Sequence, residues 1–186
     1  MFRPCDANEV AEAWRAIMPL RHSPVALALT RQAVPTLDRS RYAPAADVAR
    51  GGYVLADCEG VPEVILIATG SEVQLAVAAY EELTEDGVRA RVVSMPCWEL
   101  FDQQPAEYRD HVLIPSVTAR VAVEQASTVG WDRYVGIDGA VIGMRTFGAS
   151  APLKALAAEF GFTSDAVVRA ARERIAAVTA GQAGRG

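Results

Sequence analysis

Residues 64–95 have the sequence VILIATGSEVQLAVAAYEELTEDGVRARVVSM, and the pattern within them indicates the fold class. Residues 64–68 and 91–95 are short, mostly apolar runs of the kind found in strands that are buried on both faces. Between them, apolar residues recur at helical spacing from about residue 72 to 86, after a capping box of Ser71 and Gln74 and before Gly87 as a stop. Strand, helix and strand in this order predict a βαβ unit with a right-handed crossover.

The chain after residue 50 continues this alternation of strands and helices. We predict further strands at residues 52–55, 119–124 and 140–144, and helices near 106–111, at 153–160 and from Thr163 or Ser164 onward. Residues 51–180 are therefore expected to form one α/β domain, with a mostly parallel sheet and helices on both faces. Residues 181–186 are expected to form a flexible tail.

The first fifty residues predict an incomplete folding unit. Asp6 or Asn8 can cap a helix over about residues 9–18, and the apolar run at 25–29 is typical of a buried strand. Prolines punctuate the irregular stretch that follows, and we assign residues 36–50 to a linker. One helix and one strand cannot enclose a core, so residues 1–35 either pack on the rest of the chain or are the end of a domain that begins upstream.

Composition and charge exclude several classes of protein. The chain of 186 residues has 18 Lys and Arg against 23 Asp and Glu, and its net charge of −5 argues against a general nucleic-acid binder. It contains no apolar run of about 18 residues for a membrane span, and its first residues lack an apolar signal core. We therefore expect a cytoplasmic protein that binds neither nucleic acid nor a membrane.

Cysteines and histidines exclude further kinds of site. Cys5, Cys58 and Cys97 are odd in number and form no CxxC pair, which favours reduced thiols over a disulfide framework. His22 and His111 lie at no metal-ligand spacing, so we expect no zinc site. A Ser-His-Asp triad would have to draw on one of these two histidines.

Two junctions between a strand and the following loop could bind an anion. The turn at residues 69–71 has the sequence Thr-Gly-Ser and opens a helix, where backbone N–H groups attract anions, although a plain helix cap explains the same residues. Neither GxxxxGK[ST] nor GxGxxG is present. Arg31 follows the apolar run at 25–29, and an arginine at a strand's carboxyl end can hold a phosphate by a bidentate contact. A salt-bridged structural arginine is the alternative from spacing alone.

Other candidate side chains have a structural interpretation beside the chemical one. Glu124 lies near Trp131 and Tyr134, where a carboxylate can act as an acid or base, or can form a buried ion pair or a subunit contact. Cys97 could be a nucleophile or a small core residue. The acidic residues that we expect to be solvated at turns are Asp57, Glu59 and Glu63.

Seven ordered segments together resemble the C-terminal part of transketolases. They are FRPCDANEVAEAW at residues 2–14, ALALTRQ at 26–32, ARGGYVLADC at 49–58, IATGSEVQLAVAAYEEL at 67–83, ARVVSMPCWELFDQQ at 90–104, YVGIDGAVIGMRTFGASAP at 134–152 and FGFTSDAVV at 160–168. The resemblance covers nearly the whole chain and is weakest in the linker, at residues 125–129 and in the tail.

This resemblance implies a ketol transferase of the pentose phosphate pathway, which moves a two-carbon unit between ketose and aldose phosphates. Transketolases are homodimers that use thiamine diphosphate and a divalent metal, Mg²⁺ or Ca²⁺. By the match, residues 1–35 are the end of the pyrimidine-binding domain, 36–50 the linker and 51–180 the C-terminal domain. Arg31 matches the arginine of the family's SRQ motif, which holds the sugar phosphate.

The resemblance implies no catalytic, cofactor-binding or metal-binding residue on this chain, since the family's GDG motif, activating glutamate and substrate-channel histidines have no counterpart here. We therefore expect a C-terminal fragment that is inactive alone and contributes sugar-phosphate binding and dimer or domain packing, with the N-terminal domains as partners. The alternatives are the C-terminal piece of a split transketolase and a free-standing α/β interaction or regulatory module.

Overall fold

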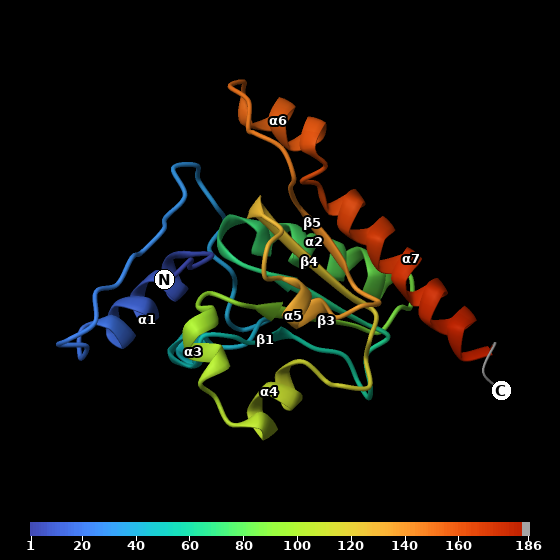
Figure 1. Ribbon diagram of the computed structural model, residues 1–186, viewed down its shortest axis with the longest axis horizontal. Helices are drawn as coiled ribbons and strands as arrows, with labels where there is room; N and C mark the ends of the chain where they lie inside the picture. Colours follow the sequence, from blue (N-terminus) through green and yellow to red (C-terminus); the bar gives the residue numbers. More distant parts are fainter. Residues whose placement is uncertain (184–186) are drawn as a thin grey trace.

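A five-stranded sheet forms the centre of the computed structural model, which describes residues 1–183 (Figure 1). Its strands are β1 Tyr53–Ala56, β2 Val64–Ala68, β3 Ala90–Ser94, β4 Arg120–Ser127 and β5 Ala140–Met144. They are arranged in the order β1-β3-β2-β4-β5, and only β1 runs antiparallel to its neighbour. The predicted mostly parallel α/β sheet and the β2-α2-β3 unit are confirmed.

The helices of the described residues lie before, between and after these strands. They are α1 Ala7–Ile17, the 3₁₀ turns η1 Ala45–Arg50 and η2 Gly70–Glu72, α2 Val73–Glu85, α3 Trp98–Asp102, α4 Ala106–Val112, α5 Asp132–Val135, α6 Leu153–Phe160 and α7 Ser164–Ala183. None of them combines the length and the apolarity needed to cross a membrane.

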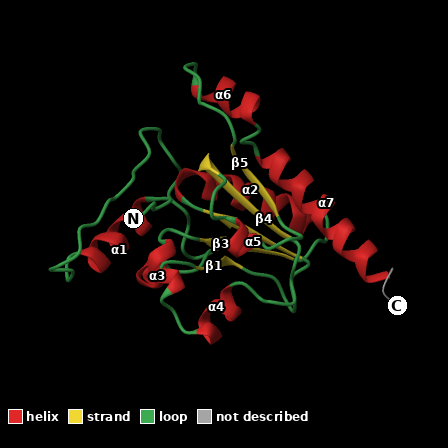
Figure 2. Ribbon diagram, in the orientation of Figure 1, coloured by secondary structure: helices red, strands yellow, loops and turns green. Residues whose placement is uncertain are grey.

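Helices cover both faces of the sheet (Figure 2). Since side chains alternate along each strand, every strand contributes to the two cores that lie between the sheet and these helices. In β2, Val64 and Leu66 pack into one core together with α2 and α7. Ile65 and Ile67 point the other way, into a second core that contains side chains of α3, α4 and α5. This two-sided burial explains why the strand is apolar at every position.

The N-terminal residues pack on the same domain. Phe2 and Ala13 are buried in the core that α2 and α7 share. The predicted strand at 25–29 is wrong, because Leu27 forms only an isolated parallel bridge with Phe2 and Leu29 is 57% exposed. A strand needs a partner along its length, and within residues 1–183 only Phe2 supplies one at this place.

Two helix ends also differ from the prediction. Helix α2 begins at Val73 after a 3₁₀ turn, and the Ser71 hydroxyl donates to the Glu72 carboxylate at 2.6 Å instead of forming a capping box. Gly87 does terminate α2, with a φ of 80° that favours glycine. Helix α7 continues to Ala183, so the predicted tail is helical at residues 181–183, while residues 184–186 lie outside the described part.

Candidate functional site

The strand order creates a topological switch point between β2 and β4. From β2 the chain passes to β3 on one side and then crosses back to β4 on the other. Open α/β sheets bind ligands at the carboxyl ends of the strands that flank such a point. A cavity of about 230 Å³ lies at this edge, and its lining includes Thr69 after β2, Met95 after β3 and Glu124 in β4.

The side chain of Arg3 lies at this switch point. Its backbone N–H donates to the Pro96 carbonyl at 2.8 Å, and its own carbonyl accepts from the Gly70 N–H at 2.9 Å. The guanidinium forms an ion pair with Glu124 and lies 3.8 Å from the Glu72 carboxylate. Burial lowers the pKa of Arg3, and the negative charge of Glu72 opposes this change. The chain thus supplies its own cation to the carboxyl edge of its sheet.

Both carboxylates beside Arg3 are buried and have further donors. Glu124 is 6% exposed and accepts a hydrogen bond from the Trp131 indole at 2.5 Å. Glu72 is 1% exposed and accepts from the Gln125 backbone N–H at 3.2 Å as well as from a neighbouring hydroxyl. Of the interpretations offered for Glu124, the structure shows the buried ion pair. The oxygens of both carboxylates are thus engaged by donors of the same chain.

The turn at residues 69–71 does not present its donors to a ligand. The Gly70 N–H and the Thr69 hydroxyl both donate to the Arg3 carbonyl, at 2.9 and 3.4 Å. The Ser71 hydroxyl donates to Glu72, whose negative charge would also repel an anion. The structural interpretation of this turn therefore fits better than the anion site.

Arg31 lies elsewhere, on an irregular loop beyond the isolated bridge at Leu27. Its side chain is exposed and makes no hydrogen bond or ion pair with any residue from 1 to 183. The adjacent Thr30 hydroxyl accepts from the Gln32 backbone N–H at 3.1 Å, which forms a small turn around Arg31. The structural alternative for this residue, a salt-bridged arginine, is therefore not found in the described part of the chain.

The remaining candidates have structural roles. Cys97 is buried and burial raises the pKa of its thiol, which keeps it a core residue rather than a nucleophile. Asp57 is exposed, as expected of a turn charge, but it also accepts two hydrogen bonds from the buried Arg91 at 2.9 and 2.7 Å. Glu59 is exposed, and Glu63 forms a surface ion pair at 3.7 Å.

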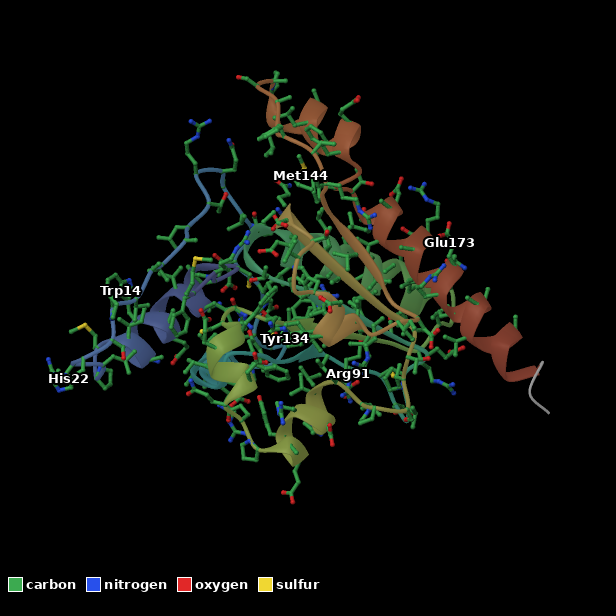
Figure 3. The ribbon with its side chains drawn as sticks, in the orientation of Figure 1. Trp14, His22, Arg91, Tyr134, Met144 and Glu173 are labelled. Atoms are coloured by element: carbon green, nitrogen blue, oxygen red, sulfur yellow. The ribbon has the colours of Figure 1, made fainter. Side chains whose placement is uncertain are left out.

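Histidine and other metal-ligating side chains are scattered over the described residues. Figure 3 shows His22 at the outer end of the loop that follows α1, far from Arg91 and Tyr134 at the sheet. Within residues 1–183, no three His, Cys, Asp or Glu side chains lie together as a metal site would require.

Sequence reasoning missed a buried acid at the contact between α1 and the sheet. Glu9 is 0% exposed and accepts hydrogen bonds from Tyr53 at 2.8 Å, Ser94 at 2.6 Å and the Cys5 backbone N–H at 2.8 Å. Asp6, which was one of two predicted caps, does cap α1 through the Glu9 N–H at 2.8 Å. The only signal in the sequence is a glutamate next to the apolar stripe of α1, and from that pattern the donors to Glu9 cannot be predicted.

The sequence is similar to that of transketolases. A family model described as the transketolase-like TK C-terminal domain matches residues 51–163. Transketolase 1 of Escherichia coli K12 is 55% identical over 172 residues, which are 92% of this chain and 26% of that protein. Transketolase of Mycobacterium bovis is 53% identical over 182 residues, with 94% of this chain and 26% of that protein covered.

Solved structures agree with these sequence relatives. Transketolase from Leishmania mexicana superimposes with a TM-score of 0.86 at 40% identity, over 94% of this chain and 25% of that one. Pichia stipitis transketolase in complex with sedoheptulose-7-phosphate gives a TM-score of 0.86 at 36% identity, over 96% of this chain and 25% of that one. The chain therefore spans about a quarter of the length of the relatives that it matches. On the family model, the sequence identity and the shared fold together, this chain belongs to the transketolase family and contains its C-terminal domain.

Proposed function

We propose that this chain is the C-terminal part of a transketolase that transfers a two-carbon ketol unit from a ketose phosphate to an aldose phosphate in the pentose phosphate pathway. The observation that carries the proposal is the 55% identity with Escherichia coli transketolase 1 over 92% of the chain. Residues 1–35 would complete the pyrimidine-binding domain, 36–50 would connect it, and 51–180 would form the C-terminal domain. The start of the family match at residue 51 supports this division.

Arg31 is the proposed contact with the sugar phosphate. It matches the arginine of the family's SRQ motif, and its exposed guanidinium has no carboxylate partner within residues 1–183. A guanidinium can form two parallel hydrogen bonds to a phosphate, which gives both affinity and orientation. A related Pichia stipitis enzyme is described in complex with a sugar phosphate, which supports the same substrate class here.

Thiamine diphosphate and a divalent metal would supply the carbanion chemistry of the complete enzyme. The residues of this chain do not fit that group, since the described part contains no cluster of three metal-ligating side chains. The Gly70 backbone N–H and the Thr69 hydroxyl, which could donate to a ligand at this turn, are also already bonded to the Arg3 carbonyl. We therefore place the cofactor on the domains that the longer relatives have, with this chain inactive by itself. Those domains and a second subunit are its proposed partners.

We also propose a cytoplasmic location for the protein. Cys5, Cys58 and Cys97 are all free thiols in the fold, which suits a reducing compartment.

Ketol transfer by a complete enzyme tests this function. The enzyme that carries this sequence as its C-terminal part should convert a ketose phosphate and an aldose phosphate in the presence of thiamine diphosphate and Mg²⁺, and the isolated chain should not. A folded complete enzyme that fails on every phosphorylated donor and acceptor pair would contradict the proposal. An upstream reading frame without a cofactor domain, in itself or in a neighbouring gene, would favour the free-standing module.

A further inference from the structure

We propose that the C-terminal domain positions the loop that carries Arg31, and that the Arg3–Glu124 ion pair fixes this arrangement. Residues 28–37, which carry Arg31, are here called the Arg31 loop, and residues 2–6 are called the clamp segment. The clamp segment contacts both the sheet and the Arg31 loop, and so connects them. This inference rests on the proposed function, because it assigns positioning residues to the sugar-phosphate contact.

Both ends of the Arg31 loop are bonded to the clamp segment. At the first end, the Ala28 N–H donates to the Phe2 carbonyl at 2.8 Å, beside the bridge between Phe2 and Leu27. At the second end, the Leu37 N–H donates to the Asp6 carboxylate at 3.0 Å. The Arg39 guanidinium binds both oxygens of that carboxylate, at 3.1 and 3.0 Å, and so fixes its orientation.

Between its two ends, the Arg31 loop makes almost no hydrogen bonds. Figure 1 shows the chain after α1 as an extended loop that begins at the outer end of α1 and lies to one side of the sheet. Among the described residues, the one hydrogen bond made by residues 29–36 joins the Gln32 N–H to the Thr30 hydroxyl, inside the loop. The place of Arg31 is therefore set by where the two loop ends are held, and hence by the clamp segment.

The clamp segment is in turn bound to the carboxyl edge of the sheet. The backbone of Arg3 bridges the Pro96 carbonyl after β3 and the Gly70 N–H after β2, at 2.8 and 2.9 Å. Its guanidinium pairs with Glu124, a carboxylate whose side chain is only 8% exposed. Phe2, the adjacent residue, is buried in the core. The edge at which this type of fold binds ligands is thus used here to hold a segment of the same chain.

Glu124→Gln in the complete enzyme tests this chain of contacts. The amide keeps the shape and can still accept from Trp131, but it removes the charge that faces Arg3. We expect KM for a phosphorylated acceptor to rise about tenfold, since small displacements of a substrate-positioning group reduce rates strongly. The kcat value, and the use of an unphosphorylated acceptor, should stay within about twofold.

The matched control is Glu63→Gln. It breaks an ion pair with Arg89 at 3.7 Å at the opposite, amino end of β2, and within residues 1–183 no hydrogen bond or ion pair joins Glu63 or Arg89 to the Arg31 loop. This variant should leave both substrates unaffected. Because Glu124 is buried, a second variant is informative if Glu124→Gln lowers the yield of folded enzyme. Arg3→Lys retains the charge and should lose less than Arg3→Ala with the phosphorylated acceptor.

A double-mutant cycle distinguishes positioning from stability. If Glu124 acts through Arg31, then Glu124→Gln should have no further effect on the phosphorylated acceptor once Arg31→Ala is present. Equal losses on both acceptors, or an undiminished loss in the Arg31→Ala background, would overturn the inference. If Arg31→Ala alone is selective for phosphorylated sugars and Glu124→Gln is not, the positioning role fails while the phosphate contact stands. If Arg31→Ala is not selective, both fail.

Discussion

Replacing Arg31 by alanine in the complete enzyme should weaken the use of phosphorylated sugars selectively. The side chain is exposed and has no hydrogen-bond or ion-pair partner within residues 1–183, so its removal breaks no such bond of the described fold. Surface substitutions of this kind change the free energy of unfolding by less than about 0.5 kcal/mol. The melting temperature should therefore stay almost constant.

The size of the kinetic effect follows from the contact that is lost. Hydrogen bonds to charged groups contribute about 1.5–3 kcal/mol each, and a bidentate guanidinium–phosphate contact is among the stronger ones. At about 1.4 kcal/mol per factor of ten, the loss corresponds to roughly a 10- to 150-fold decrease in kcat/KM. Arg31→Lys should recover only part of this, because an ammonium keeps the charge and loses the two-pronged geometry.

Steady-state kinetics with a phosphorylated acceptor and its unphosphorylated counterpart measure the selectivity directly. Arg21→Ala is a matched control, since Arg21 is another exposed arginine in the loop after α1 and its removal changes the net charge equally. This variant should leave both kcat/KM values within about twofold of the wild type.

Two results would refute the reasoning. Equal losses on both acceptors together with a lower melting temperature would make Arg31 a structural residue. The same phosphate-selective loss in Arg21→Ala would show that general electrostatic attraction, and not a specific contact, explains the effect.

Three further predictions concern stability and cofactor binding. Glu9→Ala should lower the free energy of unfolding by about 1–3 kcal/mol in urea titrations, because Tyr53 and Ser94 lose a buried acceptor. Glu9→Gln should lower it less, since the amide oxygen can still accept, and equal losses in the two variants would contradict this. Burial raises the pKa of both the Cys5 thiol and the Tyr53 hydroxyl, so each stays neutral in the fold while the unfolded chain ionises at ordinary values of about 8.5 and 10. The stability from these groups is fully present below about pH 8.5 and is lost as the pH rises, so the melting temperature should fall between about pH 8 and 10.5, and less so in Cys5→Ala; a flat profile would count against it. Calorimetry of the isolated chain with thiamine diphosphate and Mg²⁺ should show no binding, and micromolar affinity would overturn the placement of the cofactor on other domains.

Local patterns in the sequence were sufficient to predict the centre of this fold. The apolar runs of β2 and β3 are continuous because both faces of these strands are covered, and the run between them has the spacing of a helix. Gly87 ends α2 as predicted, since a backbone with positive φ there suits only glycine. The family resemblance was likewise visible in the order of the segments, without any structure.

The pattern failed where an element depends on a partner elsewhere. Residues 25–29 have the composition of a buried strand, yet a strand is stabilised by bonds to its neighbours, and within the described chain only Phe2 is placed to provide them. Ser71 has the right spacing for a capping box, but the carboxylate of Glu72 lies beside it and accepts the hydrogen bond of its hydroxyl instead. In both cases the competing contact, and not the local propensity, decided the outcome.

The sequence alone was enough to predict the strands of the central sheet, most of the longer helices and the family to which the chain belongs, but not the short helices α3 and α5. Which charges are paired became clear only from the fold. A buried charge is costly unless an opposite charge or several donors face it, but the sequence cannot say which residue will do so. Arg3 and Glu124 lie far apart in the sequence and meet only because the β3-to-β4 crossover brings the end of β4 next to the end of β2. That meeting holds the clamp segment on the sheet, and no spacing in the sequence indicates it.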